Sequence, residues 1–366
     1  MRKGWEYKRL DECANIEYGT RVVQKKDSGT LYPVYGGGGE TFRMDKFNRE
    51  DCLIVARFAM SRRCVRFVNG KFFLNDSGLS VKAGDKLYQS YLNYNIISLN
   101  DDIYHLGKGA AQRNLDVKSF KKLTIAIPPQ STQLAIVSEL DKINELIRLK
   151  KEQLKDFDNL AQSLFYEMFG DPVENEKGWD VKKLKDISRE IGDGLHGTPE
   201  YSEVDTGCYF INGNNLENGT IVIKENTKMV SEKTKAKHYI EMDDFTILVS
   251  INGTLGKVAF YNGENVILGK SACYIKLEAY NDKKYIFELL KSDYFKRYAE
   301  SECTGTTIRN VSLKSMRNFR CPLPPLPLQR LFAQRIEQIE REKSEVQKSI
   351  QDLETLLASR MQYWFE

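Results

Sequence analysis

The feature that most constrains this chain is a long amphipathic segment that occurs twice. In the first copy, steps of four and three residues alternate along an apolar series with one charged member: Ile136, Leu140, Ile143, Ile147, Lys150, Leu154, Phe157, Ala161, Leu164 and Met168. An offset of 196 residues gives a second series with two basic members: Phe332, Ile336, Ile339, Lys343, Val346, Ile350, Leu353, Leu357, Arg360 and Trp364. This is the heptad spacing of a coiled-coil seam. One such helix could be an ordinary core helix, but two in register predict a helix pair.

The residues that flank each helix repeat as well. At the same offset, Gly109-Ala-Ala-Gln-Arg-Asn114 corresponds to Gly305-Thr-Thr-Ile-Arg-Asn310, and Pro128-Pro129 corresponds to Pro324-Pro325. Gln133 corresponds in the same way to Gln329. The start Trp5-Glu-Tyr-Lys-Arg-Leu10 resembles Trp179-Asp-Val-Lys-Lys-Leu184. Because internal repeats are stronger evidence of architecture than local propensities, the sequence predicts a tandem duplication.

Four segments follow from these markers. Proline cannot extend a sheet or occupy a helix interior, so each proline pair predicts a boundary between a globular domain and a long helix. The predicted segments are a globular domain at 1–129, a helix at 130–170, a second globular domain at 171–325 and a second helix at 326–366. A chain of 366 residues has room for two such domains, each with its own core.

Composition narrows the class of protein. Charged residues make up 29% of the chain and hydrophobic residues 41%, no apolar run approaches about 18 residues, and no signal-peptide core follows the start, so we expect a cytoplasmic protein. Seven cysteines and three histidines are dispersed without a CxxC pair, which favours reduced thiols over a zinc site. The net charge of +4 is only mildly basic, so nucleic-acid binding has to be argued from local clusters.

Basic side chains gather after a predicted buried strand, Asp51–Arg57, in the first domain. Guanidinium groups with interleaved aromatic residues suit phosphate contacts and guanine edges, although a solvated strand face would have the same composition. A run of four glycines at 36–39 would permit close approach to a phosphate backbone or simply a tight hairpin, and both interpretations remain open. The candidate nucleic-acid contacts of this domain are Arg57, Arg62, Arg63, Arg66, Gly37, Gly38, Lys25 and Lys26.

The second domain has different side chains at the corresponding point. The predicted strand Asp244–Ser250 leads into Asn252-Gly-Thr-Leu-Gly-Lys257, and the segment at 211–219 is dense in turn formers and amides. Amide side chains can read adenine edges, but more often they cap turns. The candidate contacts here are Asn214, Asn252, Thr254 and Lys257. Arg113 and Arg309 occur in both copies, so we assign them a shared role, either anchoring phosphates or bracing each domain against its helix.

Common catalytic signatures are absent from the sequence. The segment Gly263–Ser271 resembles a Walker A loop but has five residues between its glycines where four are needed. We find no Asp/Asn-Pro-Pro-aromatic methyltransferase motif, no glycine-rich S-adenosylmethionine loop, and no local Ser/His/Asp or Cys/His arrangement. We therefore expect no catalytic residue, metal or cofactor in this chain.

The order of these features resembles the DNA-specificity (S) subunit of type I restriction–modification systems. A globular unit, a Gly-x-x-x-Arg-Asn segment, a Pro-Pro-x-x-x-Gln helix start and a long heptad helix occur, and then all four occur again. Tyr32-Pro-Val-Tyr-Gly-Gly37 and Leu248-Val-Ser-Ile-Asn-Gly-Thr-Leu-Gly256 also resemble recurring phrases of that family's target-recognition domains. One departure is that Thr132 and Leu328 precede the two glutamines, where the family often has glutamate.

The resemblance implies an α+β fold. Two tandem α/β target-recognition domains would be separated by two long helices that form an antiparallel coiled coil, an internal repeat with pseudo-two-fold symmetry and a domain at each end. The DNA site would be bipartite and non-palindromic, with an unread gap. The implied partners are double-stranded DNA and two modification (methyltransferase) subunits that use S-adenosylmethionine, with restriction subunits that use ATP and Mg²⁺ in systems that have them. The chain itself would read DNA and catalyse nothing.

Other functions remain compatible with the sequence. The alternatives are a stand-alone enzyme with an unfamiliar active site, a coiled-coil scaffold whose end domains bind proteins, and the target-recognition region of a fused restriction–methylation enzyme. Apolar residues off the seam also predict a partner-binding surface on the helices, although contact with the chain's own domains would explain them equally well. These residues are Val137, Leu146, Leu149, Leu160, Phe165, Leu331, Leu356 and Tyr363.

Overall fold

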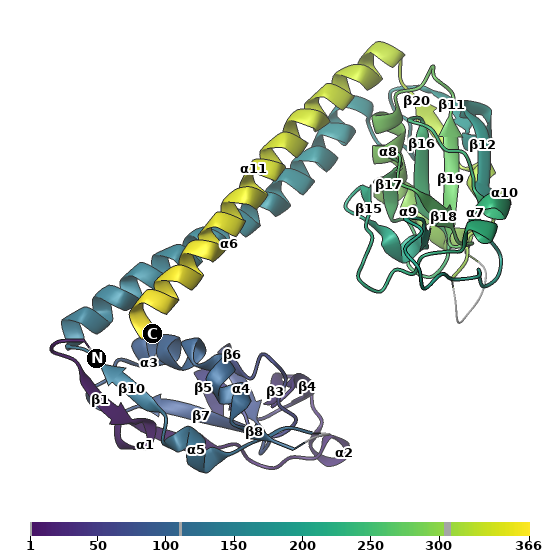
Figure 1. Cartoon of the computed structure of the whole chain (residues 1–366). Helices are drawn as coiled ribbons and strands as arrows, with labels where there is room; N and C mark the ends of the chain where they lie inside the picture. Colours follow the sequence, from purple (N-terminus) through teal and green to yellow (C-terminus); the bar gives the residue numbers. More distant parts are fainter. Residues whose placement is uncertain (1, 110–111, 304–308) are drawn as a thin grey trace. The chain divides into compact units, whose positions relative to one another are not determined.

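The computed structural model describes residues 2–109, 112–303 and 309–366. The chain forms two compact units, unit 1 with Met1–Glu152 and Gln347–Glu366, and unit 2 with Gln153–Val346. Two long helices, α6 (Gln130–Phe169) and α11 (Leu326–Phe365), each contribute one part to both units (Figure 1). The unit boundaries therefore lie inside the helices, whereas the predicted division treated the helices as separate segments.

Unit 1 contains a mixed sheet with short helices around it. Its strands are β1 (Glu6–Arg9), β2 (Ala14–Tyr18), β3 (Tyr32–Gly36), β4 (Gly39–Met44), β5 (Arg49–Ala56), β6 (Val65–Leu74), β7 (Gly78–Ala83), β8 (Gly107–Lys108), β9 (Asn114–Leu115) and β10 (Thr124–Ile127). Its short helices are α1 (Leu10–Cys13), α2 (Gln24–Asp27), α3 (Gln89–Ser98), α4 (Asn100–His105) and α5 (Val117–Lys121). Six strands form one sheet in the order β2-β7-β5-β6-β3-β4, and β1 pairs separately with β10.

Unit 2 repeats this plan with shorter strands. Its strands are β11 (Asp180–Lys183), β12 (Ser188–Asp193), β13 (Tyr209–Ile211), β14 (Leu216–Glu217), β15 (Thr220–Ile221), β16 (Thr246–Ser250), β17 (Val258–Phe260), β18 (Val266–Leu268), β19 (Ala272–Leu277) and β20 (Arg320–Leu323). Its helices are η1 (Leu184–Ile187), η2 (Gly213–Asn215), α7 (Glu232–His238), α8 (Lys283–Lys291), α9 (Asp293–Ser301) and α10 (Leu313–Asn318). The order β12-β19-β16-β17 matches β2-β7-β5-β6 of unit 1, and β11 pairs with β20 as β1 pairs with β10.

Single hydrogen bonds confirm the duplication. The buried hydroxyl of Tyr91 donates to the carbonyl of Ala126 at 2.9 Å, and the buried hydroxyl of Tyr285 donates to the carbonyl of Pro322 at 2.7 Å. The parallel pair of β3 with β6 likewise has its counterpart in β13 with β18. The expected fold class is therefore confirmed: two tandem α+β domains with an internal repeat, each packed on long helices.

The two long helices pack on each other in antiparallel fashion within each unit. In unit 1, Lys151 forms an ion pair with Glu354 at 2.8 Å, and Arg360 forms one with Glu139. In unit 2, Lys343 forms an ion pair with Asp158 at 2.5 Å. As the residue number rises along α6, the residue number of its partner on α11 falls, so the two helices are antiparallel. The predicted seam is at least partly buried along its length.

The structure corrects two residues of the predicted partner-binding surface. Val137 is 8% exposed and belongs to the core of unit 1, and Phe165 is 4% exposed and belongs to the core of unit 2. Phe165 stacks on Tyr285 with ring centroids 5.9 Å apart. Near its domain each helix needs a second apolar face, because it packs on both the other helix and the globular core. The remaining residues of that set are exposed.

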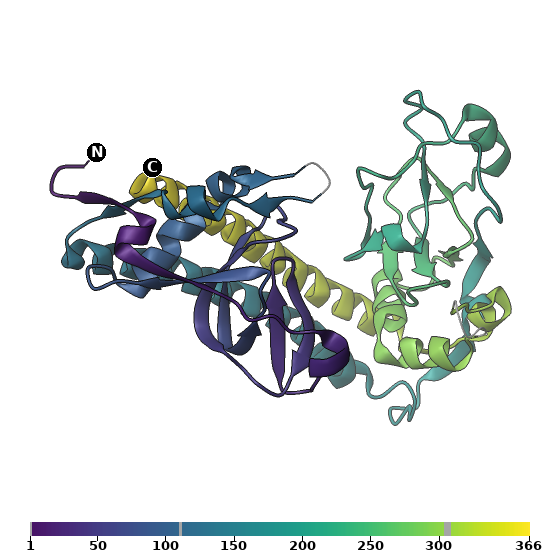
Figure 2. The same ribbon diagram turned by 90° about the horizontal axis from the view of Figure 1, so that it is seen from below.

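The beginning and the end of the described chain lie together in unit 1 (Figure 1 and Figure 2). The guanidinium of Arg2 lies 4.9 Å from the ring centroids of Trp5 and Tyr363, and it donates a hydrogen bond to the carbonyl of Tyr363. The C-terminal part of α11 is thereby attached to the N-terminal segment. Among the described residues, no helix is both long enough and apolar enough to cross a membrane.

Candidate nucleic-acid interface

In unit 1, neighbouring segments fix the loop that follows β5. The backbone N–H of Arg57 donates to the carbonyl of Ser77, and the carbonyl of Arg57 accepts from the N–H of Leu115, both at 2.8 Å. The N–H of Met60 donates to the carbonyl of Arg113 at 2.9 Å. The loop therefore lies between the β6–β7 turn and β9, so the arginines that follow β5 start from a rigid support.

Aromatic rings orient three arginines of unit 1, two from the loop after β5 and one, Arg113, from the segment before β9. The guanidinium of Arg57 lies 4.4 Å from the ring centroid of Phe58 and 5.0 Å from that of Tyr18. Arg62 and Arg113 both lie over the ring of Tyr104, at 5.1 and 4.6 Å. Stacking on a ring face holds a guanidinium in place while its charge stays available.

The glycine run forms a tight hairpin between β3 and β4, and close approach to a phosphate backbone stays a prediction. Gly36 pairs with Gly39 across the β3–β4 turn, and the N–H of Gly37 donates to Oγ of Ser77 at 2.9 Å. A Cβ on Gly37 would lie 2.2 Å from the carbonyl oxygen of Phe58, which explains the absence of a side chain there. Gly38 is exposed at the tip.

The predicted basic residues of unit 1 divide into two groups. Arg66 is half-buried, donates to the carbonyls of Arg63 and Gly37 at 2.8 and 3.4 Å, and has a pKa that is lowered by burial and then by Arg63. Arg66 therefore braces the hairpin. The exposed basic residues are Arg62, Arg63, Lys25 and Lys26, the last two on α2. Arg113 donates to the carbonyl of Tyr104 on α4 at 3.2 Å, a contact within the domain and not with a long helix, so the two roles predicted for Arg113 remain predictions.

Unit 2 fixes its corresponding loop with the same backbone bonds. The N–H of Ile251 donates to the carbonyl of Ser271 at 3.0 Å, and the carbonyl of Ile251 accepts from the N–H of Val311 at 2.9 Å. The N–H of Gly213 donates to Oγ of Ser271 at 2.9 Å, as Gly37 does to Ser77. Ile251 therefore occupies the position of Arg57, and Asn252 that of Phe58. By the same comparison the exposed residue Asn214 corresponds to Gly38.

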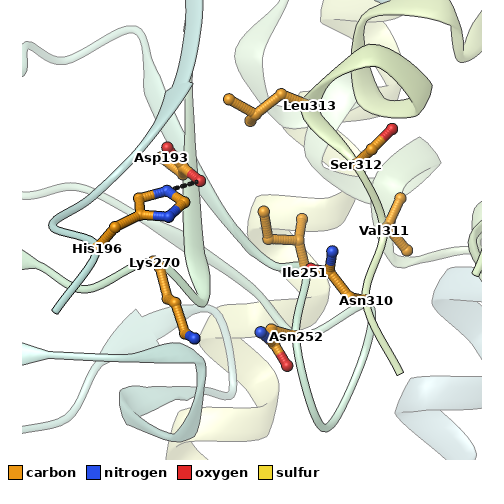
Figure 3. A pocket seen from close by; sticks show the side chains of 9 residues that line it. All are labelled: Asp193, His196, Ile251, Asn252, Lys270, Asn310, Val311, Ser312 and Leu313. Carbon is orange, nitrogen blue, oxygen red and sulfur yellow. Dashed lines mark hydrogen bonds and ion pairs between the residues drawn. The ribbon is translucent and has the colours of Figure 1, made fainter. Parts of the chain in front are cut away.

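An open pocket of about 440 Å³ lies beside this loop in unit 2 (Figure 3). Its polar lining comes from four segments: the end of β12 with the turn after it, the loop after β16, the β18–β19 connection, and the segment before α10. The main polar side chains are Asp193, His196, Asn252, Lys270 and Asn310. Nε2 of His196 lies 2.8 Å from Oδ2 of Asp193. Of the predicted contacts in unit 2, Asn252 is the one that lines this pocket.

The other candidates in unit 2 lie elsewhere. Lys257 lines a different pocket and lies 3.9 Å from the carboxylate of Glu217, while Thr254 is exposed at the loop tip. Arg309 lies 3.5 Å from Glu300, and its carbonyl accepts from the N–H of Gly253 at 3.0 Å. The backbone of Arg309 thus braces the loop as that of Arg113 does in unit 1.

Sequence reasoning missed several residues of these sites. Tyr18, Asp193 and His196 belong to strands or turns far from the arginine and asparagine loops in the sequence, so only strand pairing brings them there. Lys270 belongs to the segment that we rejected as a Walker loop, and that segment contains β18. Of the repeated Gly-x-x-x-Arg-Asn segments, 110–111 and 305–308 lie outside the described residues. The described part of the chain has no cluster of three His, Cys, Asp or Glu that could hold a metal ion.

Comparison with known proteins decides the family. The family described as "Type I restriction modification DNA specificity domain" matches residues 2–156 and 176–355. The chain belongs to this family. Both duplicated domains lie within the matched residues, so the family resemblance seen in the sequence is confirmed. As a member of the specificity family, the chain is the DNA-recognition component of a type I system, and catalysis is not its role.

Individual relatives agree with this assignment. The chain is 22% identical over 321 residues to the type I restriction enzyme MjaVIII specificity subunit of Methanocaldococcus jannaschii, covering 79% of this chain and 75% of the relative. It is also 22% identical to the putative specificity subunit S.HindORF215P of Haemophilus influenzae, covering 92% and 87%. The crystal structure of the S subunit from M. genitalium matches with a TM-score of 0.55 at 17% identity, covering 98% of this chain and 95% of that one. A chain from a structural study of type I complex assembly matches with a TM-score of 0.61 at 17% identity, covering 100% and 98%. The two structural matches bear on the fold alone.

Proposed function

We propose that each unit reads one half of a bipartite, non-palindromic DNA site. The observation that supports this most directly is the presence of one loop framework in both units with different side chains on it. Arg57 and Phe58 occupy the framework in unit 1, and Ile251 and Asn252 occupy it in unit 2. A duplicated scaffold with divergent side chains is what recognition of two unlike half-sites requires.

The exposed basic residues of unit 1 fit contact with the DNA backbone. Arg62 and Arg63 lie at the loop surface, and Lys25 and Lys26 are exposed on α2. Each phosphate that is neutralised by such a residue releases counterions, so affinity should fall steeply with salt. Substitution of Arg62 and Arg63 by alanine should weaken binding and reduce the salt dependence. A scaffold whose domains bind only proteins would show no DNA affinity that falls with salt.

Methylome sequencing tests the proposed function. Cells that express this chain with its modification subunit should acquire adenine methylation at one motif with two unlike halves and a fixed unread gap. The matched control is the modification subunit without this chain, which should leave the genome unmethylated at that motif. A wild-type complex that methylates a single continuous or palindromic motif would contradict the proposal.

The catalytic groups in this proposal come from partner subunits. Two modification subunits would supply S-adenosylmethionine and methyl transfer, and restriction subunits, in a system that has them, would supply ATP- and Mg²⁺-dependent cleavage. The chain itself would bind none of these cofactors. Because its substrate would be chromosomal DNA, we expect the chain to act in the cytoplasm. Assays of the purified chain alone for methyl transfer and nuclease activity should therefore be negative.

The exposed apolar residues of the long helices are the proposed docking surface for the modification subunits. Leu146 and Leu149 remain 47% and 46% exposed in unit 1, although the seam residues Ile143 and Ile147 are buried. The double variant Leu146→Asp/Leu149→Asp should lose the modification subunit in size-exclusion chromatography and keep its own fold, because neither side chain is in the core. Lys155→Asp is the control, since this exposed position lies about half a turn around α6 from Leu146. Full assembly of the double variant would contradict docking at this surface.

A further inference from the structure

Strand register shows which residues of the two units occupy equivalent positions around the loops after β5 and β16, and the side chains at these positions differ. Because Arg57 and Ile251 bond in the same way to Ser77 and Ser271, the two strand pairs can be compared residue by residue. Tyr18 pairs with Leu79 in unit 1, and Asp193 pairs with Cys273 in unit 2, two residues beyond the equivalent serines. Tyr18 therefore corresponds to Asp193, and Asp76 corresponds to Lys270.

The source of the positive charge differs between the two sites. In unit 1 the cation is Arg57, which extends from the end of β5, stacks on Tyr18 and donates to the carbonyl of Asp76 at 3.3 Å. In unit 2 the residue after β16 is the apolar Ile251, and the cation is Lys270 from the β18–β19 connection. Without an arginine–tyrosine stack, the position in unit 2 is an open pocket (Figure 3).

His196 contributes a second polar group with a defined orientation. The carboxylate of Asp193 can only accept, so the facing Nε2 of His196 carries a proton and donates to it. Nδ1 of the neutral ring is then left as an acceptor. The same turn is fixed by the N–H of Leu195, which donates to the carbonyl of Leu268 at 2.7 Å, as that of Thr20 does to Leu74 in unit 1. The imidazole is therefore held by its carboxylate partner, and the turn that carries it is held by the backbone bond of Leu195.

We propose that Lys270, Asn252 and His196 form the base-reading site of unit 2 and contact base edges of the second DNA half-site. The proposal rests on the function proposed above and names the residues through which one unit would discriminate sequence. Lysine donates to guanine O6 and N7, and asparagine forms paired hydrogen bonds with adenine N6 and N7. The two side chains therefore present donors and an acceptor that are complementary to base edges.

The composition of the pocket favours a base edge over a phosphate. The carboxylate of Asp193 lines the same pocket and is only 19% exposed, so it would repel a phosphate that entered. The amide of Asn252 offers a donor and an acceptor, and Nδ1 of His196 offers an acceptor. A phosphate, which only accepts, would leave both of these acceptors unused.

The variants Lys270→Ala, Asn252→Ala and His196→Gln test this site in the full complex with the modification subunits. Methylome sequencing should show relaxed or changed bases in one half of the motif and an unchanged other half. Binding to duplexes with single base changes in that half should show roughly 10- to 100-fold loss of discrimination at the affected position. All three side chains lie at the pocket surface outside the core, so the fold should be preserved, and a thermal melt checks this.

Two controls make the outcomes distinguishable. Lys185→Ala removes an exposed lysine of η1 that does not line the pocket, and it should leave the motif unchanged. Arg57→Ala in unit 1 should change only the other half of the motif. A uniform loss of affinity with an intact motif and a weaker salt dependence would show phosphate contact, and unchanged binding would show no contact; either result overturns the proposal. A wild-type complex without a bipartite motif would instead overturn the underlying function.

Discussion

At the scale of single residues, the two repeated glutamines have a clear structural role. Oε1 of Gln133 accepts from the N–H of Tyr88, and its Nε2 donates to the carbonyls of Lys86 and Pro128, each at 2.9 Å. Gln329 makes the corresponding bonds to Asp282 and Pro324 at 3.0 and 2.8 Å. Each glutamine thus joins the start of a long helix to its domain. The bond to the proline carbonyl is buried in both copies, and the other bonds are partly buried.

Gln133→Ala should lower the free energy of unfolding of unit 1. The side chain is fully buried, and its removal leaves backbone donors and acceptors unsatisfied, at a cost of about 1–3 kcal/mol. Urea denaturation monitored by circular dichroism measures the change. Gln130→Ala, at an exposed position three residues earlier, should cost far less. Equal effects of the two substitutions would show that the buried amide contributes no special stability.

At the scale of elements, Arg360 and Lys343, two of the three charged seam positions of the long helices, have acidic partners. Arg360 donates through Nη2 to Glu139 at 3.1 Å, and the indole N–H of Trp364 donates to the same carboxylate at 3.0 Å. Lys343 pairs with Asp158 in the other unit. An apolar seam alone tolerates shifts in register, whereas each of these pairs is satisfied in only one alignment of the helices. The two basic interruptions of the second helix therefore specify the register.

The Glu139–Arg360 pair predicts a pH dependence of stability. Hydrogen bonding from Arg360, opposed by burial and aided by Trp364, holds the pKa of Glu139 below its ordinary value. A carboxyl whose folded-state pKa is lowered stabilises the fold above its unfolded-state pKa and loses this effect as the pH falls through the folded-state pKa. Glu139→Gln should therefore lower the unfolding free energy at pH 7 by less than about 1 kcal/mol, since the pair is partly solvated.

The same difference should shrink in acid. As the pH falls below the ordinary pKa of glutamate, about 4.3, and through the lowered folded-state pKa of Glu139, wild type and Glu139→Gln should converge in chemical denaturation curves, because both side chains become neutral. Glu345→Gln, at an exposed position of α11, is the control and should show little difference at any pH. A constant gap between Glu139→Gln and wild type from pH 7 to pH 3 would contradict the assigned charge interaction.

At the scale of the whole molecule, the sequence predicted what repeats and periodicity encode. Both long helices begin and end within one residue of the expected positions, because heptad spacing and proline pairs are local signals. The strand before the arginine loop was likewise predicted. The sequence did not indicate that Tyr18, His196 and Lys270 lie at these sites, because only the pairing of strands that are distant in the sequence brings them next to the loops after β5 and β16. For Val137 and Phe165 the sequence left contact with a partner and contact with the chain's own domains open, because a periodicity does not show which second surface a helix packs against; the structure shows the second.

The long helices also predict how the gap in the DNA site is set. Each has 40 residues, a length of roughly 60 Å at the rise of an α-helix, and each belongs to both units. If the paired helices determine the separation of the two recognition domains, the unread gap should follow helix length and not the recognition loops. Four residues are about one helical turn, so an insertion of this size disturbs the seam only as a local stutter.

Paired insertions test this dependence. Four residues added between Lys150 and Lys151, together with four between Leu353 and Glu354, lengthen both helices near the Lys151–Glu354 ion pair and keep them matched. The added rise of roughly 6 Å is close to two base pairs, so the methylome should show both half-sites unchanged and a gap longer by one or two base pairs. Four residues inserted into the exposed loop at 203–205 should leave the gap unchanged. An active variant with longer helices and the original gap would show that the spacing is set elsewhere, and altered half-sites would show that the helices influence base reading itself.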